Sequence, residues 1–405
     1  MTTTINKEQK NPNVPNLRFP EFEGEWKRTS LKDISTVNPK SASLEESFVY
    51  IDLEAVEKGI LKKQQTILRS EAPSRAQRVI MDGDILFQCV RPYQKNNYLH
   101  KGQNNDKTQW VASTGYAQIR TTESPSYLYH TLNTDGFNKK VMVRCTGSSY
   151  PAINSDDLST IHFYFSPQKE EQRKISQLFD LLDERIATQN KIIDKLQSLI
   201  KGLNNHLCQQ HGNEIETSFA DLGVSYSGLS GKTAADFGRG KPFITYLNVY
   251  SSNVIDETLY QYVQIGSKEK QNVVRYGDVL FTLSSETPEE VGIGSVYLGN
   301  QEVYLNSFCF GIHVTNTQKV FSPYISYYIS TTQFRKFIYP FAQGSTRFNL
   351  CKSDFEKASF KLPSLENQKQ IYESLKCFSD KVAVEETILK QYYSQKQYLL
   401  RQMFI

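Results

Sequence analysis

The stretch 227–237 contains the sequence GLSGKT, whose glycines, lysine and threonine are the residue types that bind phosphate in nucleotide-binding loops. Such loops have the spacing G-x-x-x-x-G-K-[ST], and the position five residues before Gly231 is Tyr226. A tyrosine Cβ there blocks the tight turn that points backbone amides at phosphate. The spacing therefore favours a polar loop that carries Lys232 over an ATP site.

Three other chemical patterns are incomplete. A DNA adenine methyltransferase needs the motif [DNS]-P-P-[YFW], and the chain contains no Pro-Pro pair. The sequence Gly292-Ile-Gly294 has two glycines of a dinucleotide fingerprint, but Tyr297 occupies the position of the third. His206, Cys208 and His211 could bind a metal, but on a helix His206 and Cys208 point to different faces. We therefore expect a polar stretch at a frayed helix end there, with no catalytic residue and no metal site in the chain.

Composition limits the class of protein. The chain has 405 residues, of which 39% are hydrophobic and 12% aromatic, enough for the cores of about two or three domains. Its formal charge of +4 does not by itself indicate a nucleic-acid partner, so a basic surface would have to be local. The six cysteines form no C-x-x-C pair, which favours a reduced, cytoplasmic protein. The N-terminus lacks a basic-then-apolar leader, and no apolar run is long enough to span a membrane.

The chain contains one sequence unit twice. TSLKDI at 29–34 matches TSFADL at 217–222 at an offset of 188, and GDILF at 83–87 matches GDVLF at 277–281 at an offset of 194. At an offset of 197, Gly147-Ser148 matches Gly344-Ser345 and Asp157 matches Asp354. Because the offset is nearly constant over most of the chain, we predict two copies of a mixed α/β domain, each followed by a long helix.

Each predicted long helix has an apolar seam with alternating steps of three and four residues, which is a heptad pattern. The predicted seam residues are Ile175, Phe179, Leu182, Ile186, Ile193 and Leu196 in the first copy, and Ile371, Leu375, Phe378, Val382 and Leu389 in the second. Gln189 and Glu385 interrupt the two seams at equivalent places. The order domain, helix, domain, helix then predicts an antiparallel coiled coil.

The expected fold class is α+β: two recognition domains in an internal repeat, joined by two long helices into a dumbbell with a pseudo-twofold axis. The expected parts are a disordered tail at 1–16, a first domain at 17–166, a central helix at 167–207, a second domain at 208–362 and a C-terminal helix at 363–405.

These features resemble the specificity subunit of type I restriction–modification systems. The resemblance rests on VPNLRFPEFEGEW at 14–26, on APSRA, GDILF and VRP between 72 and 92, on QKEEQRKI at 168–175 and on LENQKQI at 365–371. GLSGKTAADFGRG at 228–240 also resembles a loop of some recognition domains in this family.

The resemblance implies a non-catalytic subunit in which each domain recognises one half of a bipartite double-stranded DNA target. It also implies that the helices dock two modification subunits, and restriction subunits in the full complex. S-adenosylmethionine, ATP and Mg are then expected on the partner subunits, with no cofactor in this chain and no membrane association.

Basic and hydroxyl residues beside polar loops are the candidate DNA contacts. They are Arg75, Arg91, Lys95, Lys139, Arg144 and Ser148 in the first domain, and Lys232, Arg239, Lys241, Ser285, Arg335, Ser345 and Arg347 in the second. Because the two copies diverge after their GD[IV]LF strands, we predict that residues 88–101 read one half-site and residues 282–297 the other. The alternative function is a non-enzymatic coiled-coil adaptor whose two heads bind protein.

Overall fold

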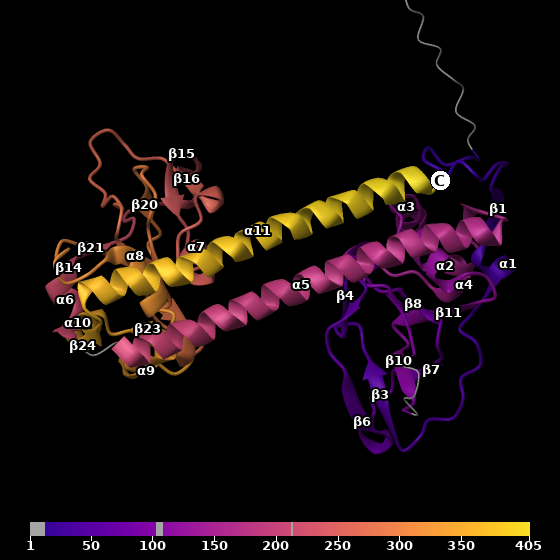
Figure 1. Ribbon diagram of the computed structural model, residues 1–405, viewed down its shortest axis with the longest axis horizontal. Helices are drawn as coiled ribbons and strands as arrows, with labels where there is room; N and C mark the ends of the chain where they lie inside the picture. The colour runs from indigo at the N-terminus through magenta and orange to yellow at the C-terminus, as the bar shows by residue number, and fades with distance from the viewer. Residues whose placement is uncertain (1–12, 103–107, 212–213) are drawn as a thin grey trace, which may run out of the picture. The chain divides into compact units, whose positions relative to one another are not determined.

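The computed structural model describes residues 13–102, 108–211 and 214–405. They form two compact units (Figure 1). Unit 1 contains the described residues of Met1–Lys191 together with Thr387–Ile405, and unit 2 contains those of Ile192–Glu386. Helix α5 (Lys169–His211) begins in unit 1 and ends in unit 2, and α11 (Leu365–Met403) begins in unit 2 and ends in unit 1. The predicted α+β class, with two mixed domains and two long helices, is confirmed.

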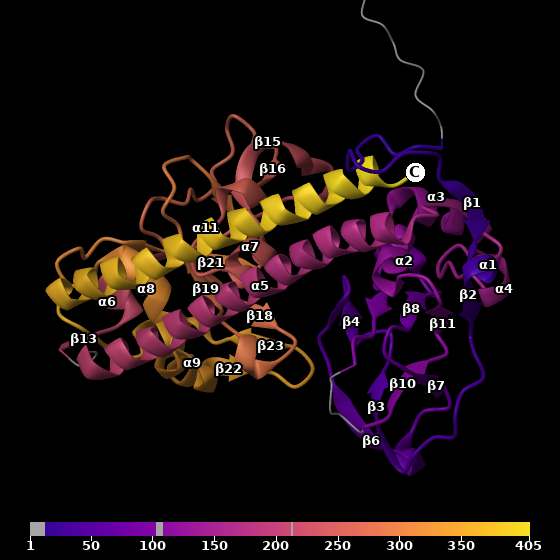
Figure 2. The same ribbon diagram turned by 45° about the vertical axis from the view of Figure 1, so that its right-hand side comes forward.

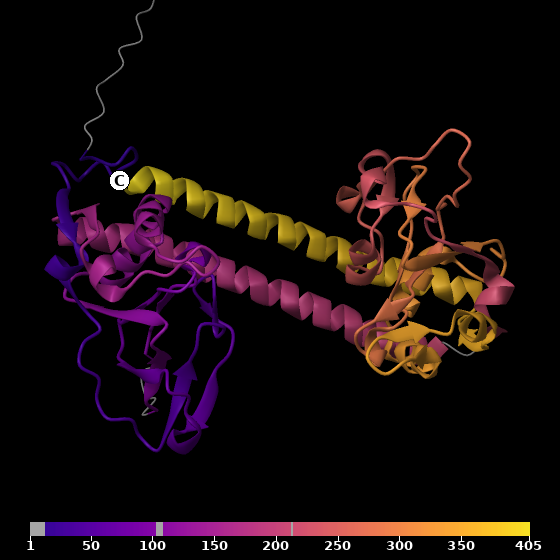
Figure 3. The ribbon, with the colours of Figure 1, turned by 180° about the vertical axis from the view of Figure 1, so that it is seen from behind.

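Two four-stranded sheets form the domain of unit 1. The sheet β2-β11-β8-β9 is antiparallel, whereas β6-β3-β10-β7 contains one parallel pair, β3 with β10. Their strands are β2 (Ser35–Val37), β3 (Ser47–Ile51), β6 (Gln65–Leu68), β7 (Ala76–Ile80), β8 (Ile85–Gln88), β9 (Tyr98–Leu99), β10 (Trp110–Ser113) and β11 (Tyr116–Thr121). The remaining elements of the domain are β1 (Lys27–Ser30), β4 (Val56–Glu57), β5 (Ile60–Leu61), β12 (His162–Phe165), α1 (Leu31–Ile34), α2 (Pro125–Leu132), α3 (Asp135–Arg144) and α4 (Ser155–Ser159). The sheet with β3 and β6 lies at the end of unit 1 away from α5 (Figures 1 and 3).

Unit 2 has the corresponding sheets. They are β14-β21-β17-β19, which is antiparallel, and β16-β15-β20, in which β15 and β20 are parallel; a third sheet has the order β18-β23-β22. Their strands are β14 (Gly223–Ser227), β15 (Phe237–Ile244), β16 (Gln261–Val263), β17 (Val279–Thr282), β18 (Ser284–Ser285), β19 (Gly294–Val296), β20 (Tyr304–Leu305), β21 (Cys309–Val314), β22 (Ala342–Gln343) and β23 (Phe348–Leu350). The remaining elements are β13 (Ile215–Thr217), β24 (Phe360–Leu362), α6 (Phe219–Leu222), α7 (Tyr246–Ser251), α8 (Ser322–Tyr328), α9 (Thr332–Ile338) and α10 (Lys352–Lys357).

The repeat seen in the sequence is present in the structure. Each domain opens with a strand that pairs with the last strand of the domain, β1 with β12 and β13 with β24. Each opening strand leads into a one-turn helix that is closed by a serine and an aspartate, Ser30 with Asp33 and Ser218 with Asp221. The prediction of two copies of one domain is therefore confirmed.

Both helix seams begin inside a domain core. In unit 1, Phe179 packs with Phe404 (ring centroids 5.7 Å apart), and Phe404 stacks on Tyr127 at 5.5 Å and contacts Trp26. Lys396 of α11 also contacts Asp183 of α5. Residue numbers therefore rise along α5 as they fall along α11, so the two helices run antiparallel in unit 1.

Unit 2 repeats this arrangement. Leu203 and Leu207 near the end of α5 share a core with Ile371 and Leu375 near the start of α11, which again gives antiparallel segments (Figure 2). The remaining seam residues are buried or half-buried, namely Ile175, Leu182, Ile186, Ile193, Leu196, Phe378, Val382 and Leu389. Gln189 and Glu385, which interrupt the seams, are also buried, at 7% and 8% exposure.

Two predictions near the helix ends are wrong. The predicted central helix at 167–207 is Lys169–His211 in the structure. The last turns are not a frayed polar stretch, because Cys208 is 2% exposed and its Sγ lies 3.2 Å from the buried Tyr324 hydroxyl. Tertiary packing on α8 holds those turns in helical form. Within the described residues no cluster of three His, Cys, Asp or Glu side chains could hold a metal.

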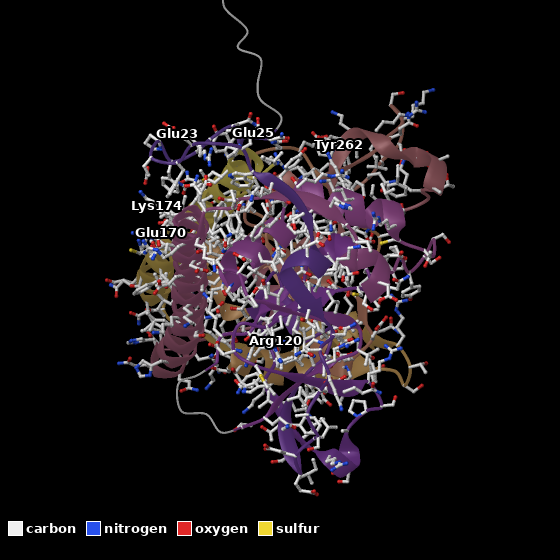
Figure 4. All side chains as sticks on the ribbon, turned by 90° about the vertical axis from the view of Figure 1, so that its right-hand side faces the viewer. Glu23, Glu25, Arg120, Glu170, Lys174 and Tyr262 are labelled. Carbon is white, nitrogen blue, oxygen red and sulfur yellow. The ribbon has the colours of Figure 1, made fainter. Side chains whose placement is uncertain are left out.

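The N-terminal segment that precedes β1 is partly ordered. Of the predicted disordered tail at 1–16, residues 1–12 lie outside the described residues, but Pro15 is buried. Arg18 forms a bidentate ion pair with the fully buried Glu171 of α5, at 2.6 and 2.9 Å. Lys174 of α5, which is labelled in Figure 4, forms an ion pair with Glu21 of this segment. The tail prediction is therefore wrong for residues 13–16, which are anchored by a segment that packs on the start of α5.

Candidate nucleic-acid interface

Each unit places two divergent loops side by side. In unit 1 the segment after β8 meets the Gly147-Ser148 turn, where the amide of Ile153 donates to the carbonyl of Cys89 at 3.0 Å. In unit 2 the equivalent hydrogen bond joins Leu350 to Leu283 at 2.8 Å. The repeat therefore fixes the backbone of this loop pair, while the side chains on it differ.

In unit 1 the loop pair holds a half-buried arginine against an exposed aromatic ring. The guanidinium of Arg91 lies 4.3 Å from the centroid of the Tyr150 ring, a cation–π contact. Tyr150 is 64% exposed and the neighbouring Tyr93 is 50% exposed. Ser148 is also exposed. Cationic, aromatic and hydroxyl groups thus gather on one surface that could meet a nucleic acid.

The other candidates of unit 1 are dispersed. Lys95 forms an ion pair with Asp135 at 2.7 Å, and Arg144 donates to the carbonyl of Asp157 and the hydroxyl of Thr160, both at 2.7 Å. These two side chains hold local structure. Lys139 on α3 and Arg75 before β7 are exposed but lie on different elements. The structure therefore places Arg91 and Ser148 on one loop pair, whereas the Lys95 side chain is bonded to Asp135 of α3.

In unit 2 the arginine of the loop pair comes from the other loop. Ser285, at the position equivalent to Arg91, is 6% exposed, and its hydroxyl donates to Glu290 at 3.0 Å. Arg347, at the position equivalent to Tyr150, is exposed, as is Ser345. Arg335 donates to the carbonyls of residues 289, 291 and 292 and is a structural residue. Much of the predicted reading stretch 282–297 is buried, with its exposed residues between 286 and 289.

Lys232 of the GLSGKT stretch is tied inside the domain. Its side chain is 8% exposed, and its Nζ lies 2.6 Å from both Glu269 and the carbonyl of Gln264. Hydrogen bonds from Lys232, from the amide of Gly266 and from Gln271 lower the pKa of Glu269 to about 2. The charge of the Lys232 ammonium is therefore already balanced by the Glu269 carboxylate. A lysine that binds phosphate would instead need its ammonium to be accessible.

We expect Lys232→Met to loosen the loop at 264–271 and to leave the salt dependence of DNA binding unchanged. Because the pKa of Glu269 is lowered from its usual 4.5, the pair stabilises the loop above about pH 4.5, and this contribution is lost as the pH falls toward 2. Amide hydrogen exchange of 264–271 near pH 7 is the measurement. Lys270→Met, which alters an exposed lysine of the same loop, is the control for the exchange measurement. Unchanged exchange with a shallower salt slope would instead place Lys232 on phosphate.

Arg239 and Lys241 lie on a different element from the loop pair. Both are exposed on β15, beside the exposed Tyr262 of β16, which is labelled in Figure 4. The sequence prediction named neither Tyr262 nor Tyr150. Tyr150 could have been predicted as a surface residue from its position next to the Gly147-Ser148 turn. No sequence pattern predicts Tyr262, because it is the pairing of β16 with β15 that places it beside the two cations.

No helix among the described residues is both long and apolar enough to cross a bilayer.

Comparison with known proteins identifies the family. The sequence profile of the family described as "Type I restriction modification DNA specificity domain" matches residues 23–198 and again residues 232–391. The type I restriction enzyme HindI specificity subunit of Haemophilus influenzae (strain ATCC 51907 / DSM 11121 / KW20 / Rd) is 25% identical over 186 residues. That match spans 44% of this chain and 40% of that relative.

Two solved structures share the fold. One is a chain from the structure described as "Structural basis underlying complex assembly and conformational transition of the type I R-M system", with a TM-score of 0.56, 21% identity, and coverage of 93% of this chain and 96% of that one. The other is the type I restriction-modification S subunit from M. genitalium, with a TM-score of 0.54, 13% identity, and coverage of 97% and 99%. Since the family profile covers most of the chain in two matches, one in each repeated domain, the chain belongs to the type I restriction modification DNA specificity domain family.

Proposed function

We propose that this chain is the DNA sequence-specificity subunit of a type I restriction–modification complex and reads a bipartite, asymmetric target. The observation that carries the proposal is a duplicated specificity domain with one scaffold and two different exposed surfaces. Unit 1 exposes Tyr150, with the half-buried Arg91 against its ring, whereas unit 2 exposes Arg347, Arg239 and Lys241. Different side chains on a common framework are what two unlike half-sites require.

We also propose that each unit docks one modification subunit. Leu181 of α5 in unit 1 is 60% exposed, and Leu199 of α5 in unit 2 is 50% exposed. Ile192 is 39% exposed, whereas Leu178 packs against the core of unit 1. Large apolar side chains exposed on a long helix favour packing against helices of a partner.

In this proposal the chain itself is non-catalytic and works in the cytoplasm. The modification subunits supply S-adenosylmethionine chemistry, and the restriction subunits supply the ATP- and Mg-dependent steps. The chain determines where those subunits act on double-stranded DNA. The protein-binding adaptor remains the competing function, and the salt dependence of duplex binding separates the two, because phosphate contacts give a steep log–log salt slope.

The test is to assemble the chain with the modification subunit of its own cell and to map the adenines that the complex methylates. We expect native mass spectrometry to show two modification subunits per chain, and methylation at one two-part sequence with an unread gap. Omission of this chain is expected to abolish the sequence preference. A saturated one-to-one assembly would contradict the docking proposal, and methylation without sequence preference would contradict the reading proposal.

A further inference from the structure

Strands β15 and β16 form a two-stranded ribbon at the edge of unit 2. Phe243 and Ile244 of β15 also pair with β20, but the residues before them have β16 as their neighbour. Lys241 and Phe237 both pair with Val263 of β16, so residues 238–240 bulge out of the register. In Figures 1 and 2 the ribbon lies at the upper end of unit 2, away from β23 and α9.

Glycines set the shape of this bulge. Gly238 has φ 97° and Gly240 has φ 107°, in the region that L side chains rarely adopt. A Cβ on Gly240 would also lie 2.4 Å from the carbonyl oxygen of Val263, so a side chain does not fit there. Between these two glycines, Arg239 is exposed at the tip of the bulge. Within the described part of the chain it forms no ion pair, so its guanidinium is available to a ligand.

The ribbon and its adjoining loop carry net positive charge. The exposed cations are Arg239, Lys241, Lys268 and Lys270. The two acids of the same segments are already bonded: Asp236 accepts from Thr233 at 2.8 and 2.9 Å, and Glu269 pairs with Lys232. Exposed rings lie among the cations, with Phe237 at 41% and Tyr262 at 49% exposure. This combination of free cations and aromatic edges is complementary to a polyanion that has apolar base surfaces.

The major groove of B-DNA, about 12 Å wide, admits a two-stranded β-ribbon, and a guanidinium can donate two hydrogen bonds to guanine there. We propose that the β15–β16 ribbon is the element of unit 2 that enters the major groove. In this proposal Arg239 reads a guanine and Lys241 contacts phosphate. The proposal rests on the proposed function and names the reading element of unit 2.

The same ribbon exists in unit 1 with different side chains. There β3 pairs antiparallel with β6 and parallel with β10, as β15 pairs with β16 and β20. Gln65 and Gln261 occupy equivalent positions in the two ribbons, and the next residues are Thr66 and Tyr262. The β3–β6 register runs from Ser47 to Tyr50 without a bulge. One framework with unlike side chains is the arrangement that two different half-sites need.

Two substitutions of Arg239 separate base reading from phosphate contact. The complex of the chain with its modification subunit is used, first on genomic DNA to map the methylated sequence, then on duplexes that carry this sequence with single base changes. We expect Arg239→Ala to lose about 10- to 100-fold of the discrimination at one base pair of one half-site. Arg239→Lys keeps the charge but not the paired donors, so we expect a similar loss.

Lys241→Ala gives the contrasting result. It is expected to weaken binding to all duplexes alike and to reduce the log–log salt slope by about 1. The matched control is Lys361→Ala, which removes an exposed lysine of unit 2 on β24, outside the ribbon. It is expected to leave site choice and salt slope unchanged.

The outcomes distinguish this inference from the proposed function. If the unmodified complex shows no sequence preference, the proposed function itself fails. If the unmodified complex is specific and Arg239→Ala leaves site choice intact, only the ribbon proposal is overturned. Retained discrimination in Arg239→Lys would make Arg239 a phosphate contact and would overturn its role as a base reader. Loss of the modification subunit from ribbon variants would show a protein-docking surface and would also overturn the proposal.

Discussion

Exchange of residues 213–362 for the matching domain of a relative is expected to change one half of the methylated sequence and to leave the other half intact. The exchanged segment contains the β15–β16 ribbon and the hairpin that carries Ser345 and Arg347, but neither long helix. The proposed reading surface of unit 1 and the exposed Leu181 and Leu199 of α5 stay unchanged. Mapping of methylated adenines in cells that carry the hybrid is the measurement.

The donor domain must preserve the contacts that α8 makes with the helices. Asn204 of α5 donates to the carbonyl of Tyr327 at 2.8 Å, and the Tyr327 hydroxyl lies 2.9 Å from Ser379 of α11. A donor with tyrosine at the positions equivalent to 324 and 327 keeps this packing. The complementary exchange of residues 27–165 serves as the control and is expected to change the opposite half. If either exchange alters both halves, the two domains do not read independently and the proposed function is wrong.

Phe404→Ala is expected to destabilise unit 1 by about 3–5 kcal/mol, although the residue lies at the opposite end of the sequence from most of that unit. Phe404 is 6% exposed and contacts Trp26, Tyr127 and Phe179. Loss of the ring would leave a cavity lined by these three aromatic side chains. Urea unfolding followed by tryptophan fluorescence is the measurement, because the only two tryptophans of the chain, at positions 26 and 110, both belong to unit 1.

The control for this prediction is Tyr398→Ala. Tyr398 lies on α11, shortly before Phe404, and is 60% exposed, so its removal is expected to cost under about 1 kcal/mol. An equal small effect from both substitutions would mean that the end of α11 is not part of the core of unit 1.

The sequence by itself determined the repeat, the fold class and the long helices. The match between the two copies aligned Ser30 and Asp33 with Ser218 and Asp221, and in the structure each pair closes a one-turn helix. The heptad spacing identified buried positions such as Ile186 and Val382, because a helix of fixed periodicity turns the same face inward every three or four residues. These features depend on local spacing and could therefore be predicted without any knowledge of long-range contacts.

The sequence could not predict which basic side chains form ion pairs inside a domain and which are exposed. Lys232 and Arg239 are both basic residues in one polar stretch, yet Lys232 is paired with Glu269 while Arg239 is exposed on a bulge. The difference arises because the register of β15 on β16 brings residues 264–271 beside Lys232. A contact between segments about thirty residues apart produces no periodic pattern in either segment. It could therefore not be predicted from the spacing of residue types.

The two buried aspartates that follow the repeated glycines also show which features the sequence determines and which only the tertiary structure decides. Asp84 and Asp278 are equivalent in the repeat, because each follows the glycine of a GD[IV]LF stretch, and both are buried. Asp84 is held by Arg120 in a bidentate pair at 2.7 and 2.8 Å, whereas Asp278 accepts from Tyr226 at 2.7 Å and lies 2.8 Å from His313. The sequence determined that an aspartate stands at each turn, because that depends on neighbours in the chain. Only the tertiary structure decided what neutralises it, because those partners come from other strands of the sheet.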